Sequence, residues 1–163
     1  MRNYEFFAAC LEKEIPAFLK VIRAVPGDKL DYKPHEKNTS AGGLATQMAM
    51  EIDSLTGIFN NGGVIDYKTA GGPKTIDEMA DLFERSAKAC VDGARATNED
   101  VWKGPAKFLF DGNVAWESTA SDMAWGFLFD LIHHRGQLSV YLRPCGAKVP
   151  SIYGPSADDP GGA

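Results

Sequence analysis

The chain has little of what defines three broad classes of protein. Its 163 residues contain no uncharged apolar run near the ~18 residues that a membrane-spanning helix needs. They contain no dense lysine and arginine run, and 17 basic against 22 acidic residues give a net charge of −5, so charge offers no footprint for nucleic acid. The three cysteines lie far apart without a C-x-x-C pair, which argues against a disulfide framework or a zinc ribbon.

What is present is typical of one globular domain. Hydrophobic residues make up 44% of the chain and aromatic residues 10%, which argues against disorder. The length favours a single domain over residues 1–163. Charged residues at 12–14 interrupt the N-terminal segment, which therefore lacks the apolar centre of a secretory signal. We expect a cytoplasmic protein with reduced thiols.

Four segments repeat an apolar residue every three or four positions, which predicts amphipathic helices. They span about 4–24, about 40–59, a segment that begins after Thr75, and about 118–143. Pro16 predicts a kink or a break in the first helix. The fold class expected is all-α, an antiparallel four-helix bundle with one longer irregular connection.

Local signals mark several boundaries of these elements. Ser40 is expected to cap the second helix, and Thr75 with Glu78 forms a capping box for the third. The stretch 98–116 looks irregular, and residues 107–113 are compatible with either a short hairpin or an extended excursion.

The fourth predicted helix carries the most informative polar residues. Asp130 stands alone in the apolar run 123–132, which we expect to be the central helix, and a buried carboxylate there needs a partner. His134 follows one turn later and Gln137 two turns later, so the three side chains share a face. A spacing of one turn lets two side chains converge on a metal ion or a proton. Two alternatives remain open: a structural Asp–His pair, and a face that points to water. His133 lies off this face and is expected to be exposed.

The second predicted helix carries Gln47 and Glu51, also one turn apart. Both could reach the same interior, although for Glu51 we favour an ordinary polar edge. His35, in the connector, is expected at the surface. No Gly-x-Ser-x-Gly turn and no phosphate-binding loop is present, so no catalytic residue and no organic cofactor site is assigned.

Several motifs resemble those of the DinB/YfiT-like superfamily of four-helix bundles. They are HHRGQL at 133–138, the tail VPSIYGPSAD at 149–158, the connector LDYKP at 30–34, and the helix start SAGGL at 40–44. The resemblance extends from about residue 28 to about residue 159, and its C-terminal block is the most specific part.

The resemblance implies a divalent metal site, usually of three histidines, with one on the second helix and two on the fourth. These positions fall on Gln47, Asp130 and His134 in this chain, so only His134 is kept. A site with one nitrogen and two oxygen ligands should bind zinc or nickel more weakly and relatively favour a harder ion, or no ion at all.

The resemblance also implies an activity and an assembly. It favours a metal-dependent, or formerly metal-dependent, enzyme of the thiol-transferase type that takes a small-molecule ligand or thiol and forms a homodimer. The alternative is a metal-free small-ligand-binding or stress-response protein, in which Asp130 and His134 form a structural pair. Neither interpretation involves nucleic acid or a membrane.

Overall fold

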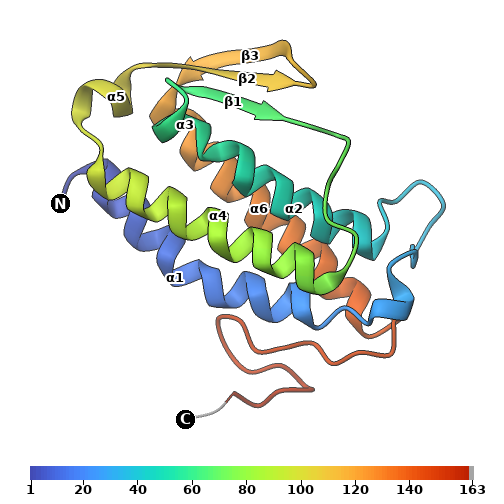
Figure 1. The fold of residues 1–163 in the computed structure, drawn as a ribbon. Helices are drawn as coiled ribbons and strands as arrows, with labels where there is room; N and C mark the ends of the chain where they lie inside the picture. Colours follow the sequence, from blue (N-terminus) through green and yellow to red (C-terminus); the bar gives the residue numbers. More distant parts are fainter. Residues whose placement is uncertain (162–163) are drawn as a thin grey trace.

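The computed structural model describes residues 1–161, and four long helices form its bundle (Figure 1). These helices are α1 (Asn3–Arg23), α2 (Ala41–Leu55), α4 (Ile76–Ala96) and α6 (Ala120–Leu142). The shorter helical elements are η1 (Gly27–Lys29), α3 (Gly57–Asn60) and α5 (Glu99–Lys103). No helix within residues 1–161 is both long and apolar enough to cross a membrane.

The four helices surround one core in the order α1, α4, α2, α6. Helix α1 packs against α4 and α6, and α2 packs against the same two helices. In Figure 1, α1 and α6 run in one direction while α2 and α4 run in the other, so two of the four neighbouring pairs are parallel. The expectation of a wholly antiparallel bundle is therefore wrong. The long connection before α4 brings the chain back to the end of the bundle where α2 begins, so α4 runs parallel to α2.

The all-α prediction is also wrong, because the chain forms a three-stranded sheet beside the bundle (Figure 1). Strand β1 (Val64–Tyr67) pairs in parallel with β2 (Pro105–Phe110), which pairs antiparallel with β3 (Asn113–Thr119). The hairpin alternative for residues 107–113 is confirmed. Asp111 and Gly112 form its turn with φ of 50° and 83°, as a two-residue hairpin turn with two left-handed positions requires.

The helix starts agree with the sequence. Ser40 Oγ accepts the N–H of Gly43 at 3.1 Å, and Thr75 Oγ1 accepts the N–H of Glu78 at 3.2 Å. The carboxylate of Glu78 in turn accepts the N–H of Thr75 at 3.1 Å, which completes the capping box. Helix α1 continues through Pro16 without a break.

The second helix ends earlier than its apolar pattern predicts, at Leu55. Gly57 explains the turn that follows, because a Cβ atom there would overlap the carbonyl oxygen of Val64. The backbone of α3 thus approaches the start of β1 closely, which only glycine permits.

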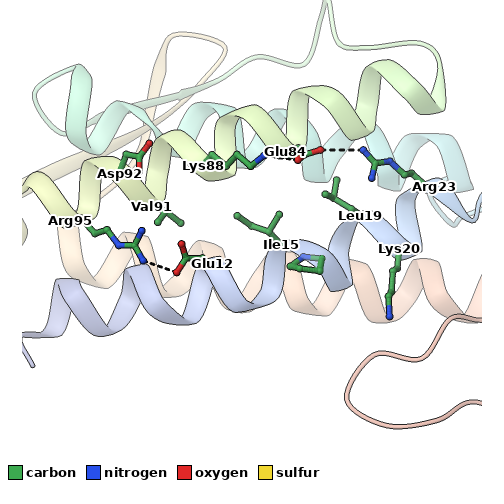
Figure 2. A pocket seen from close by; sticks show the side chains of 11 residues that line it. Glu12, Ile15, Leu19, Lys20, Arg23, Glu84, Lys88, Val91, Asp92 and Arg95 are labelled. Carbon is green, nitrogen blue, oxygen red and sulfur yellow. Dashed lines mark hydrogen bonds and ion pairs between the residues drawn. The ribbon is translucent and has the colours of Figure 1, made fainter. Parts of the chain in front are cut away.

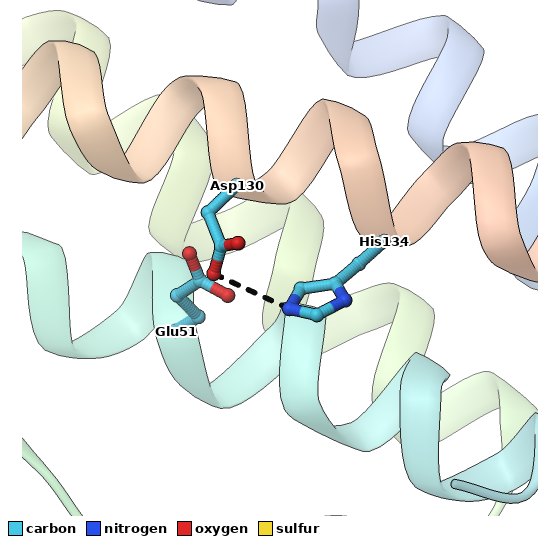
Figure 3. A group of neighbouring side chains, drawn as sticks. All are labelled: Glu51, Asp130 and His134. Atoms are coloured by element: carbon cyan, nitrogen blue, oxygen red, sulfur yellow. Dashed lines mark ion pairs between the residues drawn. The ribbon is translucent and has the colours of Figure 1, made fainter. Parts of the chain in front are cut away.

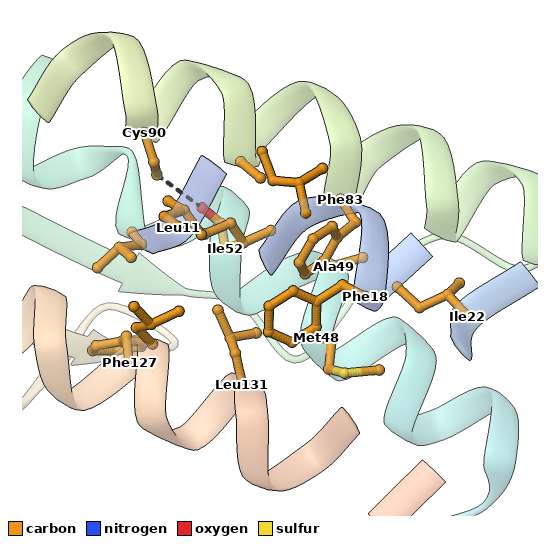
Figure 4. Close-up of a cluster of buried hydrophobic side chains, with 14 of the residues drawn as sticks. Leu11, Phe18, Ile22, Met48, Ala49, Ile52, Phe83, Cys90, Phe127 and Leu131 are labelled. Carbon is orange, nitrogen blue, oxygen red and sulfur yellow. Dashed lines mark hydrogen bonds between the residues drawn. The ribbon is translucent and has the colours of Figure 1, made fainter. Parts of the chain in front are cut away.

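All four long helices contribute side chains to the core (Figure 4). Phe18 of α1 and Phe83 of α4 meet with their ring centroids 4.8 Å apart. The thiol of Cys90 donates to the carbonyl oxygen of Ile52 at 3.6 Å, and burial raises the pKa of that thiol. Cys90 is therefore a neutral structural residue of the core.

Candidate metal centre

Three side chains that can ligate a metal converge between α2 and α6 (Figure 3). Asp130 and His134 lie one turn apart on α6, and Glu51 faces them from the antiparallel helix α2. One ligand atom from each residue lies within 4.8 Å of the other two, and His134 Nε2 is 3.2 Å from Asp130 Oδ2. These distances suit two oxygen ligands and one nitrogen ligand around a single divalent ion.

Glu51 is the buried member of this group, with 3% of its surface exposed. Its Oε1 atom has no hydrogen-bond partner among the described residues. Burial and the adjacent carboxylate of Asp130 raise the pKa of Glu51 to about 9. A buried carboxyl oxygen without a partner is costly, and a bound cation would remove that cost. The orphaned oxygen and the donor set therefore fit a divalent metal.

Two glutamines fix the orientation of His134. Its Nδ1 lies 2.9 Å from Oε1 of Gln137, and its Nε2 lies 2.8 Å from Nε2 of Gln47. An amide oxygen only accepts, so Nδ1 carries the proton and Nε2 holds a lone pair that the Gln47 amide donates to. A hydrogen bond from the non-ligating nitrogen is the usual support of a metal-binding histidine.

The predicted ligands Gln47, Asp130 and His134 do lie together, with two differences. Gln47 directs its amide nitrogen, which cannot ligate a metal, toward His134. The side chain of Asp130 is 55% exposed, although its helix was expected to be central. The interpretation of Glu51 as a polar edge is wrong, because the residue is buried beside Asp130. Its position one turn after Gln47 was the signal that could have identified it.

The other two histidines lie where the sequence places them. His133 and His35 are both exposed, and neither belongs to the cluster.

A pocket of about 330 Å³ opens beside the two acids, under the sheet. The rings of Tyr67 and Phe110 stack at 5.7 Å, and those of Phe108 and Phe127 meet edge to face at 5.3 Å. Burial, together with the nearby Glu51 and Asp111, raises the pKa of Tyr67, so its hydroxyl stays protonated. The lining residues are Gln47, Glu51, Tyr67, Thr69, Phe108, Phe110, Phe127 and Asp130.

A larger groove of about 670 Å³ lies between α1 and α4, on the opposite side of the bundle (Figure 2). Its floor is apolar, and two of its acids pair with cations: Arg95 with Glu12 at 2.6 Å and Arg23 with Glu84 at 3.2 Å. Within residues 1–161, the group on α2 and α6 is the one cluster of three metal-ligating side chains.

The bundle, its flanking sheet and the ligands on α2 and α6 define a helical protein with a candidate metal centre. The chain belongs to the DinB family, whose model matches residues 3–161. A DinB-like protein from Bacillus cereus has a similar fold, with a TM-score of 0.72 and 18% identity over 90% of this chain and 95% of that one. The DinB-like protein YjoA from Bacillus subtilis gives a TM-score of 0.65 and 16% identity over 86% and 91%. A comparison with curated proteins finds no match.

Proposed function

We propose that the protein is a metal-dependent enzyme of the DinB family, with one divalent ion held by Glu51, Asp130 and His134. The observation that carries this proposal is the buried Oε1 of Glu51, which lacks a hydrogen-bond partner among the described residues and lies beside two further ligands. A bound ion would supply a Lewis acid that lowers the pKa of a coordinated thiol or water.

The chain's own residues prepare the site for this ion. Gln137 keeps the Nδ1 proton in place, so the Nε2 atom of His134 holds a lone pair near Asp130, which an ion would take in place of the Gln47 amide. The sheet covers the buried side of the cluster, while the half-exposed Asp130 marks the open side. With two oxygen ligands, we expect weaker zinc or nickel binding than at a three-histidine site.

The aromatic pocket supports a small-molecule substrate, and the resemblance to thiol-dependent relatives suggests thiol transfer. The four rings would bind the apolar part of a thiol or of its electrophilic acceptor next to the ion. Tyr67, held as a neutral hydroxyl, is placed to donate a hydrogen bond to such a ligand.

The second candidate is the metal-free ligand-binding protein. It is favoured by the two side-chain partners of His134, since Gln47 and Gln137 satisfy both ring nitrogens without an ion. In that case, Asp130 and His134 form the structural pair, and the aromatic pocket alone binds the ligand.

Metal titration of untagged, chelator-treated protein distinguishes the two candidates. We expect isothermal titration calorimetry to find one Zn²⁺ or Mn²⁺ per chain, with affinity reduced at least about 10-fold in Glu51→Gln and His134→Gln. The matched control is His133→Gln, which removes an exposed imidazole next to the site. A stoichiometry near zero in the unchanged protein would reject the enzyme proposal and favour the metal-free one.

A further inference from the structure

The aromatic pocket beside the metal centre offers acids and rings to a ligand, but no fixed cation. Of its eight lining residues within 1–161, Glu51 and Asp130 are acids, and none is a lysine, an arginine or a histidine. Glu51 is 3% exposed, and its Oε1 atom has no hydrogen-bond partner in the part of the chain that the structure describes. The lining therefore contains a buried acceptor that nothing in the protein satisfies.

The charged residues of the neighbouring sheet do not supply the missing cation. Lys68 pairs with Asp66, and Lys107 pairs with Glu117, each with an N–O distance of 2.7 Å. Asp111, in the turn between β2 and β3, adds an acid that forms no ion pair among the described residues. Both lysines are thus offset by acids of their own, and the charge around the pocket remains negative.

An anionic ligand would also find few hydrogen-bond donors in this pocket. Thr69 donates its N–H and its hydroxyl to Asp111 at 2.9 and 2.6 Å. The amide nitrogen of Gln47 lies 2.8 Å from Nε2 of His134, which takes one of its two N–H groups. An anion that leaves water without a cation or enough donors to receive it is strongly disfavoured. The lining therefore selects against a carboxylate or phosphate group.

The rings of the pocket favour a positive group for an independent reason. The face of an aromatic ring carries partial negative charge, so it attracts an ammonium group while the alkyl substituents of that group make apolar contacts. The four rings extend from Phe127, which is 8% exposed, to Phe110, which is 48% exposed, so aromatic surface lines the pocket from its interior to its mouth. The volume of about 330 Å³ suits a small ligand.

A divalent ion in the metal centre would leave this preference in place. The ion's two positive charges would be offset by the carboxylates of Glu51 and Asp130 that hold it, and His134 is a neutral ligand. The loaded centre would therefore have no net charge with which to attract an anion. The aromatic surface and the acid in the β2–β3 turn would be unchanged.

We propose that the aromatic pocket binds an organic cation, an alkylated ammonium group that forms part of the substrate. This inference deepens the proposed function, and it rests on that function for the role of the pocket as the ligand site. The ammonium group lies among the rings, and the hydroxyl of Tyr67 donates to a polar group of the same ligand. The net charge of −5 attracts such a cation to the chain from a distance.

The first test compares probes of one shape and different charge: choline, its neutral isostere 3,3-dimethyl-1-butanol, and the anion 3,3-dimethylbutanoate. Backbone amide chemical shifts of ¹⁵N-labelled protein report binding and its location. We expect choline to bind at least about 10-fold more tightly than the alcohol, in both chelator-treated and Zn²⁺-loaded protein. The anion is compared in chelator-treated protein alone, because it would bind directly to Zn²⁺, and it should be the weakest ligand. Equal affinity for choline and the alcohol, tighter binding of the anion, or no binding of choline would overturn the proposal.

The second test separates attraction by the rings from simple apolar burial. Phe110→Leu keeps an apolar side chain at the half-exposed mouth of the pocket but removes the ring. It should lower the affinity for choline at least about 3-fold and leave the affinity for the alcohol nearly unchanged. Phe129→Leu is the matched control, since Phe129 is 63% exposed and does not line the pocket. A variant at Phe110 that weakens both probes equally, or neither, would contradict the proposal.

The outcomes remain distinct from those of the metal titration. A protein that binds choline selectively but takes up no metal would retain this inference and lose the metal-dependent enzyme. A protein that binds one metal ion per chain but does not discriminate between choline and the alcohol would retain the metal centre and lose the organic cation.

Discussion

Replacing Glu51 by glutamine tests whether the buried carboxyl group of Glu51 destabilises the metal-free protein. Burial and Asp130 raise the pKa of Glu51 to about 9, compared with an ordinary value of 4.5. The folded protein therefore keeps a proton on Glu51 that the unfolded chain releases above pH 4.5. This raised pKa lowers the free energy of unfolding as the pH rises from 4.5 to 9, and has no effect below 4.5.

The size of the effect follows from the distance between the two pKa values. Each pH unit above 4.5 lowers the free energy of unfolding by about 1.4 kcal/mol, which amounts to roughly 3 kcal/mol at pH 7. Glutamine has nearly the same shape, never ionises, and can donate to the carboxylate of Asp130. We therefore expect metal-free Glu51→Gln to be about 3 kcal/mol more stable than the unchanged protein at pH 7, and nearly equal to it at pH 4.5.

Urea unfolding in the presence of a chelator, at pH 5, 7 and 8.5, measures this difference directly. Glu36→Gln is the matched control, because Glu36 is exposed and forms no ion pair among the described residues. Saturating Zn²⁺ should reverse the order by stabilising the unchanged protein more than the variant. A variant that is less stable without metal, or a difference that stays constant with pH, would refute the assignment of Glu51 as a protonated, buried group.

Three further outcomes are expected. Gln137→Ala should weaken metal binding about 10-fold with little change in stability, since it removes the acceptor that orients His134; calorimetry checks this. Gly57→Ala should lower the free energy of unfolding by more than about 2 kcal/mol, measured in urea, because its methyl group would overlap Val64. Backbone and side-chain hydrogen bonds from Ser151, with a backbone bond from Gly161, lower the pKa of Asp159 to about 2. The C-terminal tail should therefore lose these contacts and loosen as the pH falls from about 4 to 2, because Asp159 becomes protonated. Limited acid proteolysis should detect this loosening, and Asp159→Asn should already show it at pH 7.

The features that the sequence predicts well are local ones. Ser40 and Thr75 cap their helices through bonds to residues three positions away, so the motif contains all the partners that it needs. The pairing of Asp130 with His134 is local in the same sense, because one helical turn brings the two side chains together.

The features that the sequence misses depend on distant segments. Strand β1 has four residues and is held by β2, some forty positions later, so no pattern within β1 could establish its pairing. Glu51 is buried because that sheet covers one side of α2 and α6. Its spacing from Gln47 places it on the face of the site, but the second helix alone does not reveal that the sheet buries it. The favoured polar-edge interpretation of Glu51 was therefore wrong for the same reason as the all-α prediction.

The apolar pattern of α6 presents a different discrepancy. The run 123–132 predicts a central helix buried on all sides, whereas the structure leaves Phe129 exposed within it. An apolar pattern indicates which faces a helix can bury, and single exposed apolar residues are common on protein surfaces. Phe129→Lys should therefore leave the fold intact, because the bundle's own core lies on the other side of α6.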